Sequence, residues 1–300
     1  MQDKPPLAPI VMAIVGIGLF AAMDAVMKGA ALAVGAFSAF FLRCLIGFCI
    51  IAPVWWLTGR RWPEKFVMRI HLVRGFITAF MGWSFFYSLI YLPLAEAIAL
   101  SFIAPLIALY LAALLLKEDV HPRAYFAALL GLAGVIVIVA GKLGRADLHD
   151  DIWKGLAALL ISALLYAWNL VLQRQQALVA RPAEVSMFQN GMVVLVLLAG
   201  TPFLLQWPDQ ATWNYLGAGA LFAIGATLCL TWAYARAEAQ RLVPIEYTAF
   251  LWAVLFGWFL YDETATVATI AGTALIVLGC WIATRHKERA DQHQPIDPIP

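Results

Sequence analysis

A few ionisable side chains interrupt long apolar stretches of the sequence, and these residues could do chemistry inside a membrane. They are Asp24, Lys28, Arg43, Arg74, Glu96 and Glu246. An ionisable side chain at membrane depth costs at least about 2.5 kcal/mol on insertion scales, so it usually faces protein or water and marks a functional site. The carboxylates could carry a proton or bind a cation, and the cations could bind an anionic group. The sequence therefore predicts a path for a polar solute.

The spacing of three of these residues leaves two interpretations open. Asp24 and Lys28 are four positions apart, so they could form an ion pair at a helix end, or serve as a gate or a partner for a charged substrate. Arg43 lies about two turns into its helix, where its guanidinium needs an anion. Asp24 and Glu96 are the candidates at a similar depth.

Arg74 and Glu96 also have an ordinary explanation beside a functional one. Arg74 lies near the start of a helix, where it could reach the membrane surface beside Arg69 and His71, or pair with Glu246. Glu96 lies in the first turn of its helix, where the helix dipole alone favours a carboxylate. Both explanations stay open for each residue.

The polar side chains fall into two layers at different depths. The outer layer contains Asp24, Lys28, Arg43 and Glu96, and the inner layer contains Arg74, Asn169, Gln173, Gln189, Asn190 and Glu246. Interhelical hydrogen bonds alone could explain the amides. Most aromatic side chains between the layers would pack or face lipid, and a few would line a cavity for a flat or cationic solute. The further candidates for that cavity are Tyr87, Ser101, Trp168 and Tyr247.

The composition excludes a water-soluble domain. The chain has 300 residues, of which 63% are hydrophobic and 13% are charged. Soluble domains are roughly half apolar and about a quarter charged, so lipid must be the solvent. The net charge of +2 is too small to indicate a nucleic-acid partner. The four cysteines lie in apolar stretches without metal-ligand spacing, so we expect no metal site and no cofactor.

Ten segments are apolar over about the 20 residues that a transmembrane helix needs. They are residues 8–27, 35–57, 70–91, 93–116, 123–141, 153–173, 184–205, 213–235, 240–261 and 265–284. The breaks between them carry Gly, Pro or charged residues. The polar tail at residues 285–300 is expected to be disordered. The fold class predicted is an all-α integral membrane protein with ten transmembrane helices.

The basic residues predict how the chain crosses the membrane. Of 20 Lys and Arg residues, 14 fall on the side of the N-terminus, 4 fall on the other side, and Arg43 and Arg74 fall within the spans. Because cytoplasmic loops carry the excess of basic residues, both termini are predicted to be cytoplasmic. We therefore expect a multi-pass protein of the inner membrane.

The sequence also repeats at a fixed offset of 145 positions. Glu118 falls on Glu263 at this offset, and Asp24 falls on Asn169. Each unit holds five predicted helices, so the second unit enters the membrane from the opposite side. Inverted repeats are a common construction for secondary transporters, which place the substrate near the midplane between the repeats.

Two stretches resemble the drug/metabolite transporter superfamily, EamA type. The first is Pro93-Leu-Ala-Glu-Ala-Ile-Ala-Leu-Ser-Phe-Ile-Ala-Pro-Leu106, which runs on to Lys117-Glu118, and the weaker counterpart ends at Asp262-Glu263. The resemblance implies two inverted five-helix repeats at residues 8–141 and 153–284, followed by a cytoplasmic tail at 285–300. It also implies a central cavity that includes Asp24, Arg74, Glu96, Trp168, Asn169 and Glu246.

Three shorter stretches resemble one branch of that superfamily. Met23–Lys28, Phe40–Arg43 and His71–Gly75 are similar to bacterial uptake carriers for S-adenosylmethionine and riboflavin. The common pattern of the first helix is absent, because Ala22-Met-Asp24 replaces the usual Trp-Gly-Asn or Trp-Ser pair. A substrate borrowed from the exporters of the superfamily therefore does not transfer directly.

The function predicted is secondary active transport of a small organic metabolite by alternating access. The metabolite would be an amino acid, a nucleoside-like compound or a cation such as S-adenosylmethionine. No Walker A sequence occurs, so a proton gradient, the membrane potential or exchange would drive transport. Asp24, Glu96 and Glu246 are the candidates for carrying protons. The chain would act as a monomer or a homodimer.

Other functions remain possible on the same sequence. A drug or amino-acid exporter would use the same fold. A membrane-embedded enzyme is disfavoured because the five histidines fall at or near loops, without a His-Glu pair on an apolar face, so we expect no catalytic residues. A passive channel is the third alternative, and it would show linear rather than saturable flux.

Overall fold

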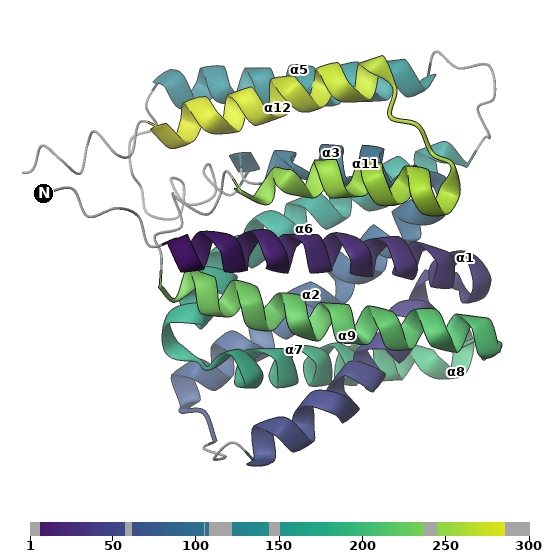
Figure 1. Ribbon diagram of the computed structural model, residues 1–300, viewed down its shortest axis with the longest axis vertical. Helices are drawn as coiled ribbons and strands as arrows, with labels where there is room; N and C mark the ends of the chain where they lie inside the picture. Colours follow the sequence, from purple (N-terminus) through teal and green to yellow (C-terminus); the bar gives the residue numbers. More distant parts are fainter. Residues whose placement is uncertain are drawn as a thin grey trace, which may run out of the picture.

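The described part of the chain is helical throughout. The computed structural model describes residues 7–57, 62–104, 106–107, 122–143, 151–236 and 245–285, and these residues contain no strand (Figure 1). The helices are α1 (Leu7–Leu57), α2 (Lys65–Tyr91), α3 (Leu94–Ser101), α5 (Pro122–Leu143), α6 (Ile152–Val179), α7 (Pro182–Leu197), the 3₁₀ turn η1 (Leu198–Gly200), α8 (Thr201–Leu204), α9 (Gln210–Tyr234), α11 (Thr248–Tyr261) and α12 (Val267–Arg285). The all-α prediction is confirmed.

Helix α1 combines the first two predicted helices. It runs for 51 residues, or about 77 Å at 1.5 Å per residue, which is enough for two membrane crossings. Gly35 interrupts it with φ 75° and ψ 155°, a backbone conformation that glycine adopts readily because it has no Cβ. The kink falls at the start of the second predicted segment, so the two spans are joined without a separate loop.

Helix α1 lies inside the bundle, against α9, α7, α2 and α11 (Figure 1). Its side chains Met27 and Phe40 are among the largest fully buried ones in the described residues. Gly82 on α2 allows Phe40 to pack so closely, since a Cβ at position 82 would lie 2.3 Å from the Phe40 Cζ atom. Small residues therefore position the polar side chains of α1 near those of neighbouring helices.

Helices α5 and α12 lie side by side at one edge of the bundle (Figure 1). Their backbones approach closely at two glycines, because a Cβ on Gly134 would lie 2.5 Å from the Gly272 carbonyl oxygen. Close packing of small residues is a usual way for helices to associate in lipid. Both helices also contact α3, which carries Glu96.

The exposed surface fits a membrane environment. Within the described residues, five helices are long and apolar enough to cross a bilayer, at Leu7–Leu57, Lys65–Tyr91, Ile152–Val179, Pro182–Leu204 and Gln210–Tyr234. Shorter apolar helices occur at Leu129–Gly141, Thr248–Tyr261 and Val267–Gly279. The chain is therefore an integral membrane protein. The number of ten spans stays a prediction, because residues 105, 108–121 and 237–244 are outside the described part, as is the predicted tail beyond Arg285.

Candidate functional site

Lys28 forms the first of two polar clusters. Its side chain is buried and forms an ion pair with Glu263, which follows α11, and its Nζ atom donates a hydrogen bond to the Leu92 carbonyl oxygen at 3.0 Å. The other carboxylate oxygen of Glu263 accepts a hydrogen bond from the Leu94 amide at 2.8 Å. We call Lys28, Glu263 and the Leu92–Leu94 turn the Lys28 cluster. It joins α1, the end of α11 and the connection from α2 to α3.

Local backbone geometry brings Glu263 to this position. Asp262 ends α11 in the left-handed conformation, with φ 52°, and turns the chain back toward α3. The Leu94 amide belongs to the first turn of α3, where amides lack partners within the helix and the helix dipole favours an anion. Tyr261 completes the contact, since its hydroxyl donates to the Ala25 carbonyl oxygen at 2.6 Å and its ring lies 5.3 Å from the Lys28 Nζ atom.

Arg74 forms the second cluster with amide side chains of α6. Its Nε atom donates to the Asn169 Oδ1 atom at 3.0 Å, and its other nitrogens donate to the side-chain oxygens of Gln173, at 3.4 Å, and Gln176. The three amides occur at positions i, i+4 and i+7, so they share one face of the helix. We call these four residues the Arg74 cluster. It ties α2 to α6.

These contacts correct the partner that the sequence suggested for Arg74. Arg74 is buried and does not reach the membrane surface, and the partners that the structure shows for it are amides rather than Glu246. Glu246 instead accepts a hydrogen bond from the Tyr234 hydroxyl. The amides accept hydrogen bonds from Arg74 but carry no charge of their own, so the guanidinium can attract an anionic group of a solute.

Tyr166 on α6 carries a hydroxyl that three charged residues influence electrostatically. Its hydroxyl group lies within electrostatic range of Asp24, Arg74 and Glu246. Two of these residues come from α1 and α2, and the third lies in the turn that precedes α11. Two carboxylates and one guanidinium therefore act electrostatically on one aromatic hydroxyl. A solute that carries both a cationic and an anionic group matches this arrangement.

Arg43 links the two predicted layers. Its Nη1 atom lies 3.3 Å from the Asn190 Oδ1 atom, and its guanidinium lies 5.0 Å from the centre of the Phe40 ring. Asp24, one of its two predicted anions, is within electrostatic range. Among the described residues its Nε atom has no hydrogen-bond partner. Because Asn190 was expected in the inner layer, the two layers meet at this pair instead of remaining separate.

Trp168 differs from its neighbour Asn169 in exposure. Its side chain is 50% exposed, whereas Asn169 beside it is only 3% exposed. Trp168 lies on the exposed stripe of α6 with Ile161, Leu164, Val171 and Leu178, at the spacing of one helix face. This stripe is apolar, so it faces lipid. Trp168 and Asn169 thus lie on different faces of α6, and a part of Trp168 in binding stays a prediction.

The remaining predicted residues make contacts with neighbours of their own. The Tyr87 hydroxyl contacts the Tyr91 hydroxyl at 3.2 Å, and the Ser101 hydroxyl donates to the Ala97 carbonyl oxygen of its own helix at 2.9 Å. Tyr247 packs edge-on against Phe102, with 5.2 Å between the ring centres. Glu96 is buried in the first turn of α3, as expected for a carboxylate at a helix start. Their part in binding stays a prediction.

Four residues at or beside the two clusters are not among the predicted site residues. Glu263 marks only the end of a predicted repeat, His71 belongs only to the stretch His71–Gly75 that carries the resemblance, and Gln176 and Glu184 have no predicted role. The signal that could have identified two of them is helical spacing. His71 and Arg74 are three positions apart on α2, and Gln176 extends the stripe that Asn169 and Gln173 begin on α6.

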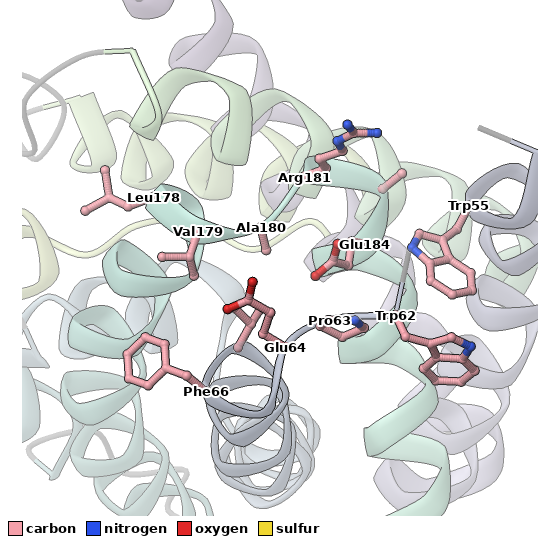
Figure 2. A pocket seen from close by; sticks show the side chains of 12 residues that line it. Trp55, Trp62, Pro63, Glu64, Phe66, Leu178, Val179, Ala180, Arg181 and Glu184 are labelled. Carbon is pink, nitrogen blue, oxygen red and sulfur yellow. The ribbon is translucent and has the colours of Figure 1, made fainter. Parts of the chain in front are cut away.

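A cavity of about 670 Å³ opens where α2 begins and α6 turns into α7. Glu64 and Glu184 turn their carboxylates into it, and Arg181 points away (Figure 2). Trp55 and Trp62 line one side. This end of the bundle carries the connections that the basic residues predict to be cytoplasmic. The cavity thus brings solvent close to the Arg74 cluster.

The fold and the site together define a class of protein. A helical bundle with an apolar surface and a charged interior is a multi-pass membrane protein, built to pass polar groups through lipid. The chain belongs to the EamA-like transporter family, whose family model matches residues 7–140 and 153–285. The resemblance seen in the sequence is confirmed, and the chain is a small-molecule transporter.

Three relatives indicate the range of solutes in the family. The pseudopaline exporter CntI of Pseudomonas aeruginosa is 25% identical over 93% of this chain and 96% of its own length. A riboflavin transporter of Brucella anthropi is 24% identical over 79% of this chain and 84% of its own. An S-adenosylmethionine uptake transporter of Rickettsia prowazekii is 20% identical, over 80% of each chain. The predicted similarity to the riboflavin and S-adenosylmethionine branch is thus confirmed.

Proposed function

We propose that the chain is a secondary carrier for a small zwitterionic or cationic metabolite in the inner membrane. The solute binds around Tyr166. The electrostatic effect of Asp24, Arg74 and Glu246 on this hydroxyl carries the proposal, because these residues offer two carboxylates for an ammonium or sulfonium group and a guanidinium for a carboxylate. Amino acids and S-adenosylmethionine have both kinds of group.

The two polar clusters act as alternating gates on either side of Tyr166. The Lys28 cluster closes the outer side and the Arg74 cluster closes the inner side. The repeat supports this pairing, because Lys28 corresponds to Gln173 at the offset of 145 positions, as Asp24 corresponds to Asn169. Equivalent positions of the two units therefore belong to opposite gates, as an inverted repeat requires. Substrate binds between them while one gate is open.

A counterflow assay tests the proposal. Purified protein in liposomes loaded with unlabelled S-adenosylmethionine, an amino-acid mixture or riboflavin should accumulate the labelled form of its own substrate with saturable kinetics. A thermal-shift screen with the same compounds selects the solute, since a ligand that binds the folded state raises its melting temperature. Linear flux would indicate a channel, and the absence of flux with every solute would overturn the proposal.

Variants of the two carboxylates provide the matching control. Asp24→Asn and Glu246→Gln remove the charge with little change in volume, and both should abolish counterflow while the amount of protein in the membrane is unchanged. Unchanged uptake kinetics in both variants would remove Tyr166 and its neighbours as the binding site. The wild-type assay would still report whether the chain is a carrier.

Export is the second candidate direction. It is favoured by the similarity to the pseudopaline exporter, which extends over nearly the whole chain. Inside-out and right-side-out vesicles distinguish the two directions, because an imposed gradient drives accumulation in only one of them. Reporter fusions at both ends of the chain test the proposed cytoplasmic termini, and cross-linking in the membrane tests whether the carrier is a monomer or a homodimer.

A further inference from the structure

A chain of side-chain contacts runs from the cavity to Arg74. Glu184, which lines the cavity, lies 3.0 Å from the Nε2 atom of His71, and the Nδ1 atom of His71 lies 2.5 Å from the Nε2 atom of Gln176. The Gln176 oxygen in turn accepts from Arg74. His71 is only 1% exposed and stacks on Phe188, with 4.6 Å between the ring centres. The ring is therefore fixed between its two polar partners.

The donors of Arg74 determine the protonation state of His71 in this arrangement. A guanidinium has only donors, so the oxygen of the Gln176 amide must face Arg74. The amide nitrogen then faces His71, and it donates to Nδ1. The Nδ1 atom is therefore an unprotonated acceptor, and the proton of the neutral ring is on Nε2, from which it is donated to Glu184.

A second proton on His71 is incompatible with these contacts. The second proton would place an N–H group on Nδ1, facing the NH₂ group of Gln176. Both groups are donors, so no hydrogen bond can form between them. Turning the Gln176 amide over would satisfy His71 but would direct its NH₂ group at Arg74, which again opposes two donors. Protonation of His71 therefore breaks one contact of the Gln176 side chain whichever way the amide turns.

We infer that His71 is a proton-binding site that opens the Arg74 cluster. The state with the intact chain of contacts holds a neutral ring, whereas the opened state leaves Nδ1 free for a proton from the solvent of the cavity. Glu184 stabilises the imidazolium and Arg74 opposes it, and Arg181 and Glu64 at the cavity contribute opposite charges. Because the proton binds only the opened state, it shifts the population toward that state.

This inference rests on the proposed function for its consequence, that protons on the cavity side open the inner gate. Its structural part is tested by a distance measurement that needs no transport. Spin labels at Phe66→Cys and Leu178→Cys, in a chain whose own cysteines are replaced, lie on exposed positions of α2 and α6 at the cavity. The distance between them should change as the pH falls from about 8 to about 5, the range in which histidine charges.

Substitution of His71 decides the result. His71→Gln does not titrate, and its amide can still accept from Gln176 and donate to Glu184, so the distance should stay at its high-pH value throughout. His286→Gln removes a histidine outside the described residues and should keep the pH response. An equal response in His71→Gln, or no response in the wild-type chain, would overturn the inference. Failure of counterflow in a chain that still shows the response would overturn the carrier proposal instead.

Discussion

The Lys28 and Arg74 clusters each stabilise a buried cation, but with different kinds of partner. Both hold helices together with a buried cation, and Lys28 and Gln173 are separated by the 145 positions of the predicted repeat. Lys28 forms an ion pair with the carboxylate of Glu263, whereas the partners shown for Arg74 are three neutral amides. The Lys28 cluster is thus held by an interaction between charges, and the Arg74 cluster by hydrogen bonds between a charge and neutral groups.

The largest effect is expected where the ion pair is broken. Glu263→Gln leaves Lys28 buried without its carboxylate and weakens the contact to the Leu94 amide, so it should destabilise the protein on the order of 3–5 kcal/mol. The measurement is thermal unfolding in detergent. The double variant Lys28→Met with Glu263→Gln should recover much of this loss, because no unpaired charge remains.

The exposed ion pair of Lys154 and Asp151 provides the control for the single and double variants of Lys28 and Glu263. Both side chains are more than half exposed, so Lys154→Met should leave the unfolding transition nearly unchanged. A double variant no more stable than Glu263→Gln would show that Lys28 and Glu263 do not act as a pair. The contrast between the two clusters would then lose its basis.

Arg74→Lys should have the next largest effect, on transport rather than on folding. Lysine keeps the charge but replaces the planar fork with one ammonium group, which cannot reach three amides at once. Loss of one hydrogen bond to a charged group corresponds to about 1.5–3 kcal/mol, so initial counterflow rates should fall at least about tenfold. Arg69→Lys on the exposed side of the same helix is the control, and a loss of similar size there would contradict a specific role of Arg74.

The sequence predicted the framework better than the contacts. Apolar segments of membrane length and turn residues between them identify the helices, because lipid requires each span to satisfy its own backbone. Depth along each helix also selected Asp24, Arg74 and Glu246 as candidates, and their part in binding stays a prediction. Depth does not determine which way a side chain points, and this is why Trp168 was placed beside Asn169 although successive residues of a helix differ by about 100°.

The partners of the charged residues depend on packing that no local pattern reveals. Lys28 meets Glu263 across 235 positions, and only the left-handed turn at Asp262 brings that carboxylate to the start of α3. Arg74 meets α6 because α2 packs along it. The spacing of His71 and Arg74 on one helix, and of Asn169, Gln173 and Gln176 on the other, contains this information once the two helices are known to be neighbours.

A pair of variants on α6 tests the region between the clusters and has an intermediate effect. Tyr166→Phe removes the hydroxyl on which the charged residues act, and should raise the solute concentration for half-maximal counterflow by about tenfold, as expected for one lost hydrogen bond. Trp168 lies on the exposed apolar stripe of α6, so Trp168→Leu should change this solute concentration by less than about twofold. The reverse order of effects would place the binding site on the other face of α6.

The smallest effect is expected at Asp209, an exposed carboxylate. Like Glu263, it accepts a hydrogen bond from a backbone amide in the first turn of a helix. Asp209 caps α9 by accepting a hydrogen bond from the Thr212 amide at 2.9 Å, and hydrogen bonding from the Thr212 side chain and then from this amide holds the pKa of the exposed carboxyl below its usual 3.8. The contribution to stability is therefore present above pH 3.8 and is lost as the pH falls through the lower pKa of the folded state. Asp209→Asn keeps a capping oxygen without a titrating group.

Amide hydrogen exchange at the start of α9 measures this contribution between about pH 5 and pH 3, after correction for intrinsic exchange rates. Protection of the Thr212 amide should fall with pH in the wild-type chain and stay constant in Asp209→Asn. A parallel fall in both chains would mean that another group titrates there. The change should be confined to the first turn of α9, because an exposed cap anchors only its own helix, whereas Glu263 anchors three segments from a buried position.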